Sequence, residues 1–257
     1  MSLALAWKIL AGVVLLAVVA TVGAITYFER TRPAALGLAT VTPRAAASPS
    51  PDDPLSLVCR RPAVSGARSG AGVAGLWVIQ PGSVAGYRAR EQFYELRSPH
   101  EAVARTDSVR GWLLVAEEGG AARIETGCVA VDVRTLSSVD ELPGFNVTDR
   151  DRISRDFLSA AEHPYVVFQP YPVTLQLSTT SSAVQHAKLA GDLEIHGTTR
   201  PAQFGLDVRL SGAQLSAAGS TVVPVEEFGI EVPQEADGFV RVDPRITLEV
   251  SLVLLKL

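Results

Sequence analysis

The alternation of apolar and polar residues is the feature that most constrains the fold of this chain. It is clearest in GCVAVDVRTL from Gly127, GDLEIHG from Gly191, FGLDVRL from Phe204 and RITLEVSLVLL from Arg245. Successive side chains of an extended strand point to opposite faces, so a period of two is typical of antiparallel strands with one buried face. Glycine, serine and proline between the stretches suit hairpin connections.

One segment departs from this period. In TDRDRISRDFLSAAEHP, the residues Ile153, Phe157 and Ala161 recur every four positions, which predicts a single amphipathic helix. Thr148 or Asp149 could cap its start, and Pro164 would end it. About eight strands and one helix in roughly 180 residues predict an all-β domain over 76–257, an eight-stranded antiparallel barrel. Such a barrel is wide enough for its own side chains or for one slender ligand.

The N-terminal residues are of another kind. After a short tail over residues 1–8, the segment 9–28 holds no charged side chain, and its 20 residues would span about 30 Å as a helix. We expect a transmembrane signal anchor there. The alternative is a signal peptide cleaved after Ala20 or Ala24, where small residues stand. The apolar run continues past both positions, which favours the anchor.

The membrane orientation depends on two opposing signals. Basic residues near the segment favour a cytoplasmic C-terminal side, whereas a single leading apolar segment ordinarily exports the domain on its C-terminal side. We expect the exported topology, with one span in the cell membrane and the barrel domain extracytoplasmic. Residues 29–75 are rich in Ala, Pro, Ser, Gly and Arg with few apolar anchors, which predicts a disordered linker.

Neither the charge nor the motifs indicate catalysis or nucleic-acid binding. The net charge is −4 without strong clustering, which gives no basic surface for nucleic acid. The four histidines have no metal-ligand spacing, and the charges around Arg152 read as the solvated face of the helix. His196 stands at a Gly-Thr-Thr corner, where we expect it to face solvent or bond the corner. We therefore expect no catalytic residue, metal or cofactor.

Six segments in a fixed order carry a family resemblance. They are WVIQPGSVAGYRARE, VRGWLLV, VAVDVRTLSS, RDRISRDFL with HPYVVFQP, GDLEIHGTTRPAQFGLDV, and EEFGI. From Trp77 onward the chain resembles the YceI-like, polyisoprenoid-binding family of bacterial lipocalin-like barrels. The resemblance implies an apolar tunnel for an isoprenoid or similar amphiphilic chain, and no catalytic residues. Many members carry a histidine in the first hairpin, whereas the equivalent stretch here is GYRAREQFYEL, with Tyr87 and Glu91.

The resemblance leads to a set of candidate ligand-binding residues. Inward-facing strand residues would line the lumen, and aromatic residues would form its walls or mouth because wide rings cover much area at little entropic cost. The lining candidates are Val129, Val131, Leu193, Ile195, Phe204, Leu206, Leu248 and Val250, and the aromatic candidates are Tyr87, Phe93, Trp112, Phe157 and Phe168.

The function expected from this reasoning is a membrane-tethered binding protein whose barrel holds an isoprenoid or other long-chain amphiphile. The same inward residues would also fill a solid barrel, and only the resemblance favours an open lumen. Two alternatives stay open: an envelope interaction module with a filled barrel, which would present loops such as 139–148, and an enzyme acting on a lipid headgroup.

The chain has two cysteines, Cys59 and Cys128. An exported domain with an even number of cysteines favours a disulfide, here between the end of the linker and a central strand. The alternative is a buried Cys128 that packs as a small apolar side chain.

Overall fold

The computed structural model describes residues 14, 18–19, 23, 32–39, 53–62, 72–94, 99–141, 146–178, 182–232 and 240–257. The chain divides into two units, Met1–Ala34 and Ala35–Leu257, and the second contains the whole sheet. The anchor predicted over 9–28 lies almost wholly outside the described residues. In the described part of the chain, no helix combines the length and apolar character needed to cross a membrane.

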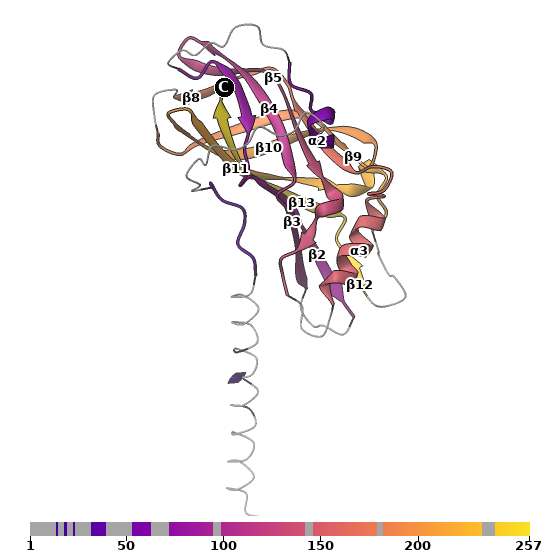
Figure 1. Cartoon of the computed structure of the whole chain (residues 1–257). Coiled ribbons are helices and arrows are strands. Elements are labelled where there is room, and N and C mark those ends of the chain that lie inside the picture. Colours follow the sequence, from indigo (N-terminus) through magenta and orange to yellow (C-terminus); the bar gives the residue numbers. More distant parts are fainter. Residues whose placement is uncertain are drawn as a thin grey trace, which may run out of the picture. The chain divides into compact units, whose positions relative to one another are not determined.

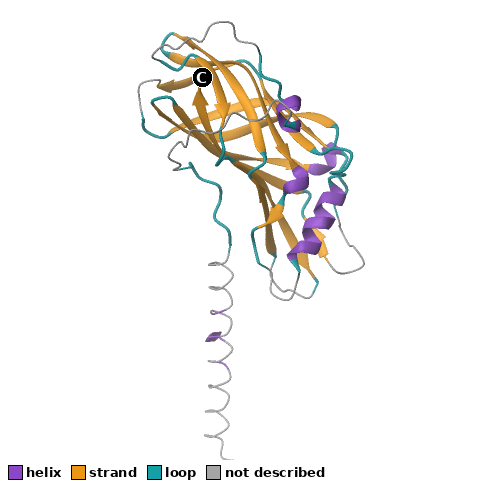
Figure 2. Cartoon of the chain, viewed as in Figure 1, coloured by secondary structure: helices purple, strands orange, loops and turns teal. Residues whose placement is uncertain are grey.

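Eight antiparallel strands close into a ring (Figures 1 and 2), which confirms the predicted eight-stranded barrel. The ring closes where the first strand pairs with the last, with Trp77 opposite Lys256. In ring order the strands are β1 (Gly75–Ile79), β4 (Val109–Glu118), β5 (Ala121–Asp132), β7 (Tyr165–Pro170), β9 (Gln185–Ile195), β10 (Thr198–Ser211), β11 (Gln214–Pro224) and β13 (Arg245–Lys256).

A second group of strands extends the sheet beyond the ring. One edge of β13 pairs with β1 near its C-terminal end and with β2 (Val84–Phe93) over residues 247–251. From β2 the sheet continues to β3 (His100–Thr106) and β6 (Ser137–Ser138), and β12 (Val240–Val242) pairs with the far end of β2. We call β2, β3, β6 and β12 the side sheet. The remaining strand, β8 (Val173–Ser178), pairs with β5.

The predicted amphipathic helix is α3 (Val147–Phe157), which lies beside the side sheet (Figure 2). Its cap is Asn146, whose side chain accepts a hydrogen bond from the Thr148 N–H, so the predicted cap at Thr148 or Asp149 is wrong. Asn, Asp and Thr are all good caps, and the pattern alone does not choose among neighbouring ones. The helix ends at Phe157, before Ser159 adopts a left-handed φ of 45°.

Two 3-10 turns follow strands of the ring. η1 (Val133–Thr135) follows β5, and the Asp132 side chain accepts a hydrogen bond from the backbone N–H of Arg134 there. η2 (Val225–Phe228) follows β11 and ends at Gly229 with a left-handed φ of 73°. Val133, Val225 and Phe228 are buried, so both turns contribute to the core.

Part of the segment predicted as a disordered linker is a short helix, α2 (Pro54–Val58). Asp53 caps the helix and forms an ion pair with Arg110 of β4 at 2.9 Å. Leu55 is buried beside Trp112, and a disulfide joins Cys59 to Cys128 of β5. Composition does not reveal this order, because one covalent bond and one apolar side chain fix the segment where the average sequence has few anchors.

Residues 36–39 also depart from the disorder prediction, because they hydrogen-bond the barrel. The backbone N–H of Leu36 donates to Glu249 Oε2 at 3.3 Å, and Ser251 Oγ donates to the carbonyl of Gly37 at 2.7 Å. Arg209 Nη2 donates to the carbonyl of Ala39 at 3.4 Å. These bonds involve backbone groups, which any sequence offers, so residue composition does not predict them.

Candidate functional site

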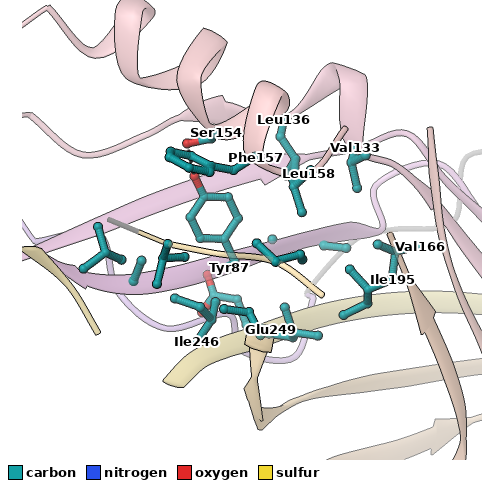
Figure 3. Close-up of a pocket in the computed structure, with 18 of the residues that line it drawn as sticks. Tyr87, Val133, Leu136, Ser154, Phe157, Leu158, Val166, Ile195, Ile246 and Glu249 are labelled. Carbon is teal, nitrogen blue, oxygen red and sulfur yellow. Dashed lines mark hydrogen bonds between the residues drawn. The ribbon is translucent and has the colours of Figure 1, made fainter. Parts of the chain in front are cut away.

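A cavity of about 460 Å³ lies between ring strands, the side sheet and α3 (Figure 3). An engineered apolar cavity of about 150 Å³ already binds benzene, so this one holds roughly three times as much hydrocarbon. Its size falls within the usual range of small-molecule sites. Most of its lining is aliphatic or aromatic.

Strand alternation explains which residues line this cavity. On β2 every second residue faces it, namely Ala85, Tyr87, Ala89, Glu91 and Phe93. The same parity holds on the paired strand β13 and on β5. Near its other end β5 carries a bulge, which restores the inward parity at Ile124 after a shift of one residue.

The structure brings together eleven of the thirteen predicted site residues around the large cavity. They are Tyr87, Phe93, Val129, Val131, Phe157, Phe168, Leu193, Ile195, Phe204, Leu248 and Val250. Leu206 faces a second, smaller cavity. Trp112 lies on the opposite face of β4 from Leu113 and Val115, in a cluster with Leu55 and Cys128. Its aromatic side chain, rather than its position in the alternation, made it a candidate, and parity places it outside.

The other end of the ring is filled by side chains. Trp77 is fully buried there, and its Nε1 donates to the carbonyl of Val73 at 2.8 Å. The second cavity, at this end, has a volume of only about 70 Å³. Phe168 and Phe204 form an edge-to-face pair at 5.1 Å and pack with Leu189, which lines the second cavity. This group of side chains therefore separates the two cavities.

Helix α3 forms a wall of the large cavity without burying any of its own residues. Ile153 and Phe157 both line the cavity, yet they are 43% and 37% exposed. Polar contacts hold the helix instead: the Tyr87 hydroxyl donates to Ser154 Oγ at 2.9 Å, and Asp151 accepts from the Ser138 N–H (Figure 3 shows Tyr87 and Ser154). The predicted apolar face of the helix therefore borders empty space.

A cluster of charged side chains adjoins the same cavity. Arg150 of α3 donates through Nη2 to Asp140 Oδ1 at 2.6 Å, and His100 Nε2 lies 2.7 Å from Asp140 Oδ2. Burial opposes ionisation of Asp140, but the hydrogen bonds from His100 and Arg150 outweigh it and lower the pKa of Asp140 to about 2. Glu91 lies 3.6 Å from Arg150, and burial raises its pKa although Arg150 opposes the shift.

Sequence reasoning does not assign these charged residues to the site. Glu91 stands out only as a departure from the family pattern, and His100, Asp140 and Arg150 carry no local mark of a site residue. One signal was available: Glu91 occupies an inward position in a strand whose other inward residues are Ala, Tyr, Ala and Phe. A carboxylate at such a position is unusual enough to indicate a specific role.

His196 bonds the corner in which it stands, as one of the two interpretations predicted. Its Nδ1 lies 3.3 Å from the carbonyl oxygen of Phe228, and its Nε2 lies 3.0 Å from Ser159 Oγ. Its φ of 53° is left-handed, which fits a tight turn. Over the described ranges, no group of three potential metal ligands comes together.

The sequence of this chain is similar to one family model and to one curated protein. The model of the YceI-like domain matches residues 87–254, which is more than half of the chain. A UPF0312 protein of Pseudomonas fluorescens (strain SBW25) is 31% identical over 138 residues. That match covers 50% of this chain and 65% of the relative, slightly less than two thirds of its length.

Solved structures show the same fold. A polyisoprenoid binding domain from Saccharophagus degradans, implicated in plant cell wall breakdown, matches with a TM-score of 0.51 at 11% identity, over 70% of this chain and 98% of that one. BcnA of Burkholderia cenocepacia has a TM-score of 0.47 at 13% identity, over 68% of this chain and 98% of its own. The family model, the ring topology and the cavity agree, and the chain belongs to the YceI-like domain family.

Proposed function

We propose that this chain is a membrane-tethered binding protein that holds an isoprenoid or similar long-chain amphiphile in the large cavity. The observation that carries the proposal is a cavity of about 460 Å³ with a mainly apolar wall. A hydrocarbon tail offers no hydrogen bonds, so it needs an apolar enclosure, and each Å² of tail removed from water contributes about 25 cal/mol before ordering costs.

The solved domain from Saccharophagus degradans supports this ligand class, because it is described as polyisoprenoid binding and shares the fold. We propose binding rather than catalysis, since aliphatic and aromatic side chains make up most of the wall and carry no group that transfers protons.

We further propose that residues 9–28 anchor the chain in the cell membrane and that the barrel is exported. The disulfide between Cys59 and Cys128 supports export, because such bonds persist in oxidising compartments. Quantitative labelling of unreduced, denatured protein should find no free thiol, and two free thiols would contradict the bond. The protein should stay in the membrane fraction through a carbonate wash. A mature N-terminus at Thr21 or Ile25 in released protein would instead indicate cleavage.

Mass spectrometry of lipid extracted from the purified full chain tests the binding function. We expect a co-purified amphiphile in the wild type and none in Val131→Asp, because an unpaired charge in an apolar cavity is too costly to bury. Val222→Asp is the matched control, since Val222 is 50% exposed on β11 and the lipid should remain. Circular dichroism checks that both variants fold. Equal lipid content in the three proteins would show that the lipid binds elsewhere.

A further inference from the structure

Two buried polar atoms face each other at the wall of the large cavity without a hydrogen-bond partner. They are Glu91 Oε2 and Arg150 Nη1, and both residues line the cavity. The two atoms lie 3.6 Å apart, which is close enough for an ion pair and too long for a hydrogen bond. The side chains are only 10% and 14% exposed. Buried polar atoms in native proteins are nearly always paired, so this pair of atoms needs an explanation.

The other polar atoms around this pair are engaged with one another. Arg150 Nη2 donates to Asp140 and also to Ser138 Oγ at 2.8 Å. Asp140 in turn accepts from the backbone N–H of Val103 at 2.8 Å and lies beside His100. The guanidinium is therefore held from one side by groups of the protein. Its other terminal nitrogen, Nη1, is left beside Glu91 at the cavity wall.

The two atoms require opposite hydrogen-bonding roles of whatever fills the gap. Arg150 Nη1 needs an acceptor and the ionised Glu91 Oε2 needs a donor. A hydroxyl group supplies both with one oxygen atom. A hydrogen bond to a charged group is stronger than a neutral one, so the pair would distinguish a hydroxyl from an ether of the same shape.

The local charge disfavours an anionic group at this position. The carboxylates of Glu91, Asp140 and Asp149 lie at or next to this wall, and Arg150 and His100 are the facing groups that can carry positive charge. Arg150 already donates to Asp140. A phosphate would therefore enter beside three carboxylates, and like charges in a site of low dielectric repel strongly.

We propose that Glu91 and Arg150 bind an uncharged, hydroxyl-bearing headgroup at the end of the apolar chain and exclude the phosphorylated form of the same lipid. The proposal rests on the proposed function, because the tail must occupy the cavity for its headgroup to reach this wall. The ligand class is then a long-chain alcohol or phenol rather than a lipid phosphate.

Three probes with one tail test the proposal on the wild-type full chain. Geranylgeraniol, its methyl ether and its monophosphate are titrated into delipidated protein in detergent micelles, and bound fractions are measured by native mass spectrometry. We expect the alcohol to bind at least about tenfold tighter than the ether, which cannot donate to Glu91. The phosphate should bind more weakly than the alcohol by a similar or larger factor.

Variants of Glu91 then assign the selectivity to this wall. Glu91→Leu should bind the alcohol and the ether within about threefold of each other, and Glu91→Gln should bind the phosphate about tenfold better than the wild type does. Glu194→Gln is the matched control, because Glu194 is exposed on β9 between the cavity residues Leu193 and Ile195. It should keep the wild-type order. Thermal unfolding checks that each variant folds, and the wild-type comparison needs no variant.

The outcomes separate this proposal from the proposed function. If the wild type binds all three probes equally, or prefers the phosphate, the cavity binds lipid but the headgroup proposal is wrong. If Glu91→Leu keeps the preference for the alcohol, the selectivity lies elsewhere and the proposal is again wrong. If none of the probes binds and no lipid co-purifies, the proposed function fails and this inference fails with it.

Discussion

The two ends of the barrel interior contrast sharply. At the packed end, around β1 and β4, Trp77, Val109 and Leu254 are at most 1% exposed, and the free volume is about 70 Å³. At the hollow end, beside the side sheet, the free volume is about 460 Å³, and Leu248 and Val250 are only partly buried. Both ends are lined by the same kinds of aliphatic and aromatic side chains.

The difference lies in the elements that cover each end. Ring strands surround the packed end, so their inward side chains meet across a short distance. At the hollow end β13 pairs with β2 instead of β1, and α3 covers the opening between the sheet edges. The helix is rich in arginine and aspartate, and polar contacts hold it in place. Strand alternation therefore determines which residues face inward, and the covering elements determine whether those residues meet.

The largest expected effect is the loss of Trp77. Trp77→Ala removes a fully buried ring and should lower the free energy of unfolding by about 4 kcal/mol, because the packed end cannot collapse around the gap. Leu248→Ala at the hollow end should cost only about 1 kcal/mol, since its side chain already borders empty space. Denaturant unfolding measures both. Equal losses would mean that the two ends are packed alike.

Two valines opposite each other on paired strands give a sharper comparison. Val109 of β4 pairs with Val131 of β5, but Val109 is buried at the packed end and Val131 lines the large cavity. Val109→Phe should therefore lower the free energy of unfolding by about 1–3 kcal/mol through overpacking. Val131→Phe should leave it nearly unchanged and displace the lipid. Loss of the fold in Val131→Phe would show that the hollow end is filled.

The polar cluster should make the hollow end sensitive to acid. The pKa of Asp140 is lowered to about 2 from its ordinary 3.8. A lowered pKa stabilises the native state above the unfolded value, and this contribution, about 2 kcal/mol, is lost as the pH falls from roughly 4 to 2. Asp140→Asn should lack this part of the pH dependence. Parallel pH profiles of unfolding for the two proteins would contradict the assignment.

Glu91 should have the opposite sign and the smallest effect. Burial raises its pKa, so its contribution to stability is present below the unfolded value and is lost as the pH rises through the native pKa. Glu91→Gln should therefore raise the free energy of unfolding at pH 7, by about 1 kcal/mol, as expected of a residue kept for binding. Thermal unfolding of the delipidated proteins measures it. A destabilised Glu91→Gln variant would indicate a structural ion pair with Arg150.

Much of the fold could be predicted from local patterns. Alternation through Val129–Val133, Leu193–Ile195 and Phe204–Leu210 indicates both the strands and their inward faces, because the pleat imposes a period of two on any half-buried strand. Most of the predicted site residues line the large cavity for the same reason. Trp112 shows the limit, since residue type without parity assigns it to the wrong face.

The remaining features depend on contacts between distant parts of the chain. The pairing of Arg150 with Asp140, and their approach to Glu91, unites a helix, a loop and a strand that no local pattern connects. The order of residues 53–59 depends on a disulfide across 69 positions. Whether the lumen is hollow depends on the balance between covering elements, and the same inward residues are compatible with either result.

The hydrogen bonds that hold Leu36, Gly37 and Ala39 against β13 and β10 begin after every cleavage position considered for the leader. Cutting after Ala20 or Ala24 would leave all three bonds in the mature chain, so the barrel would keep the same contacts with or without its leader. Processing would then change where the carrier resides and leave its ligand selectivity unaltered. A single proteolytic event could convert a tethered carrier into a released one without refolding.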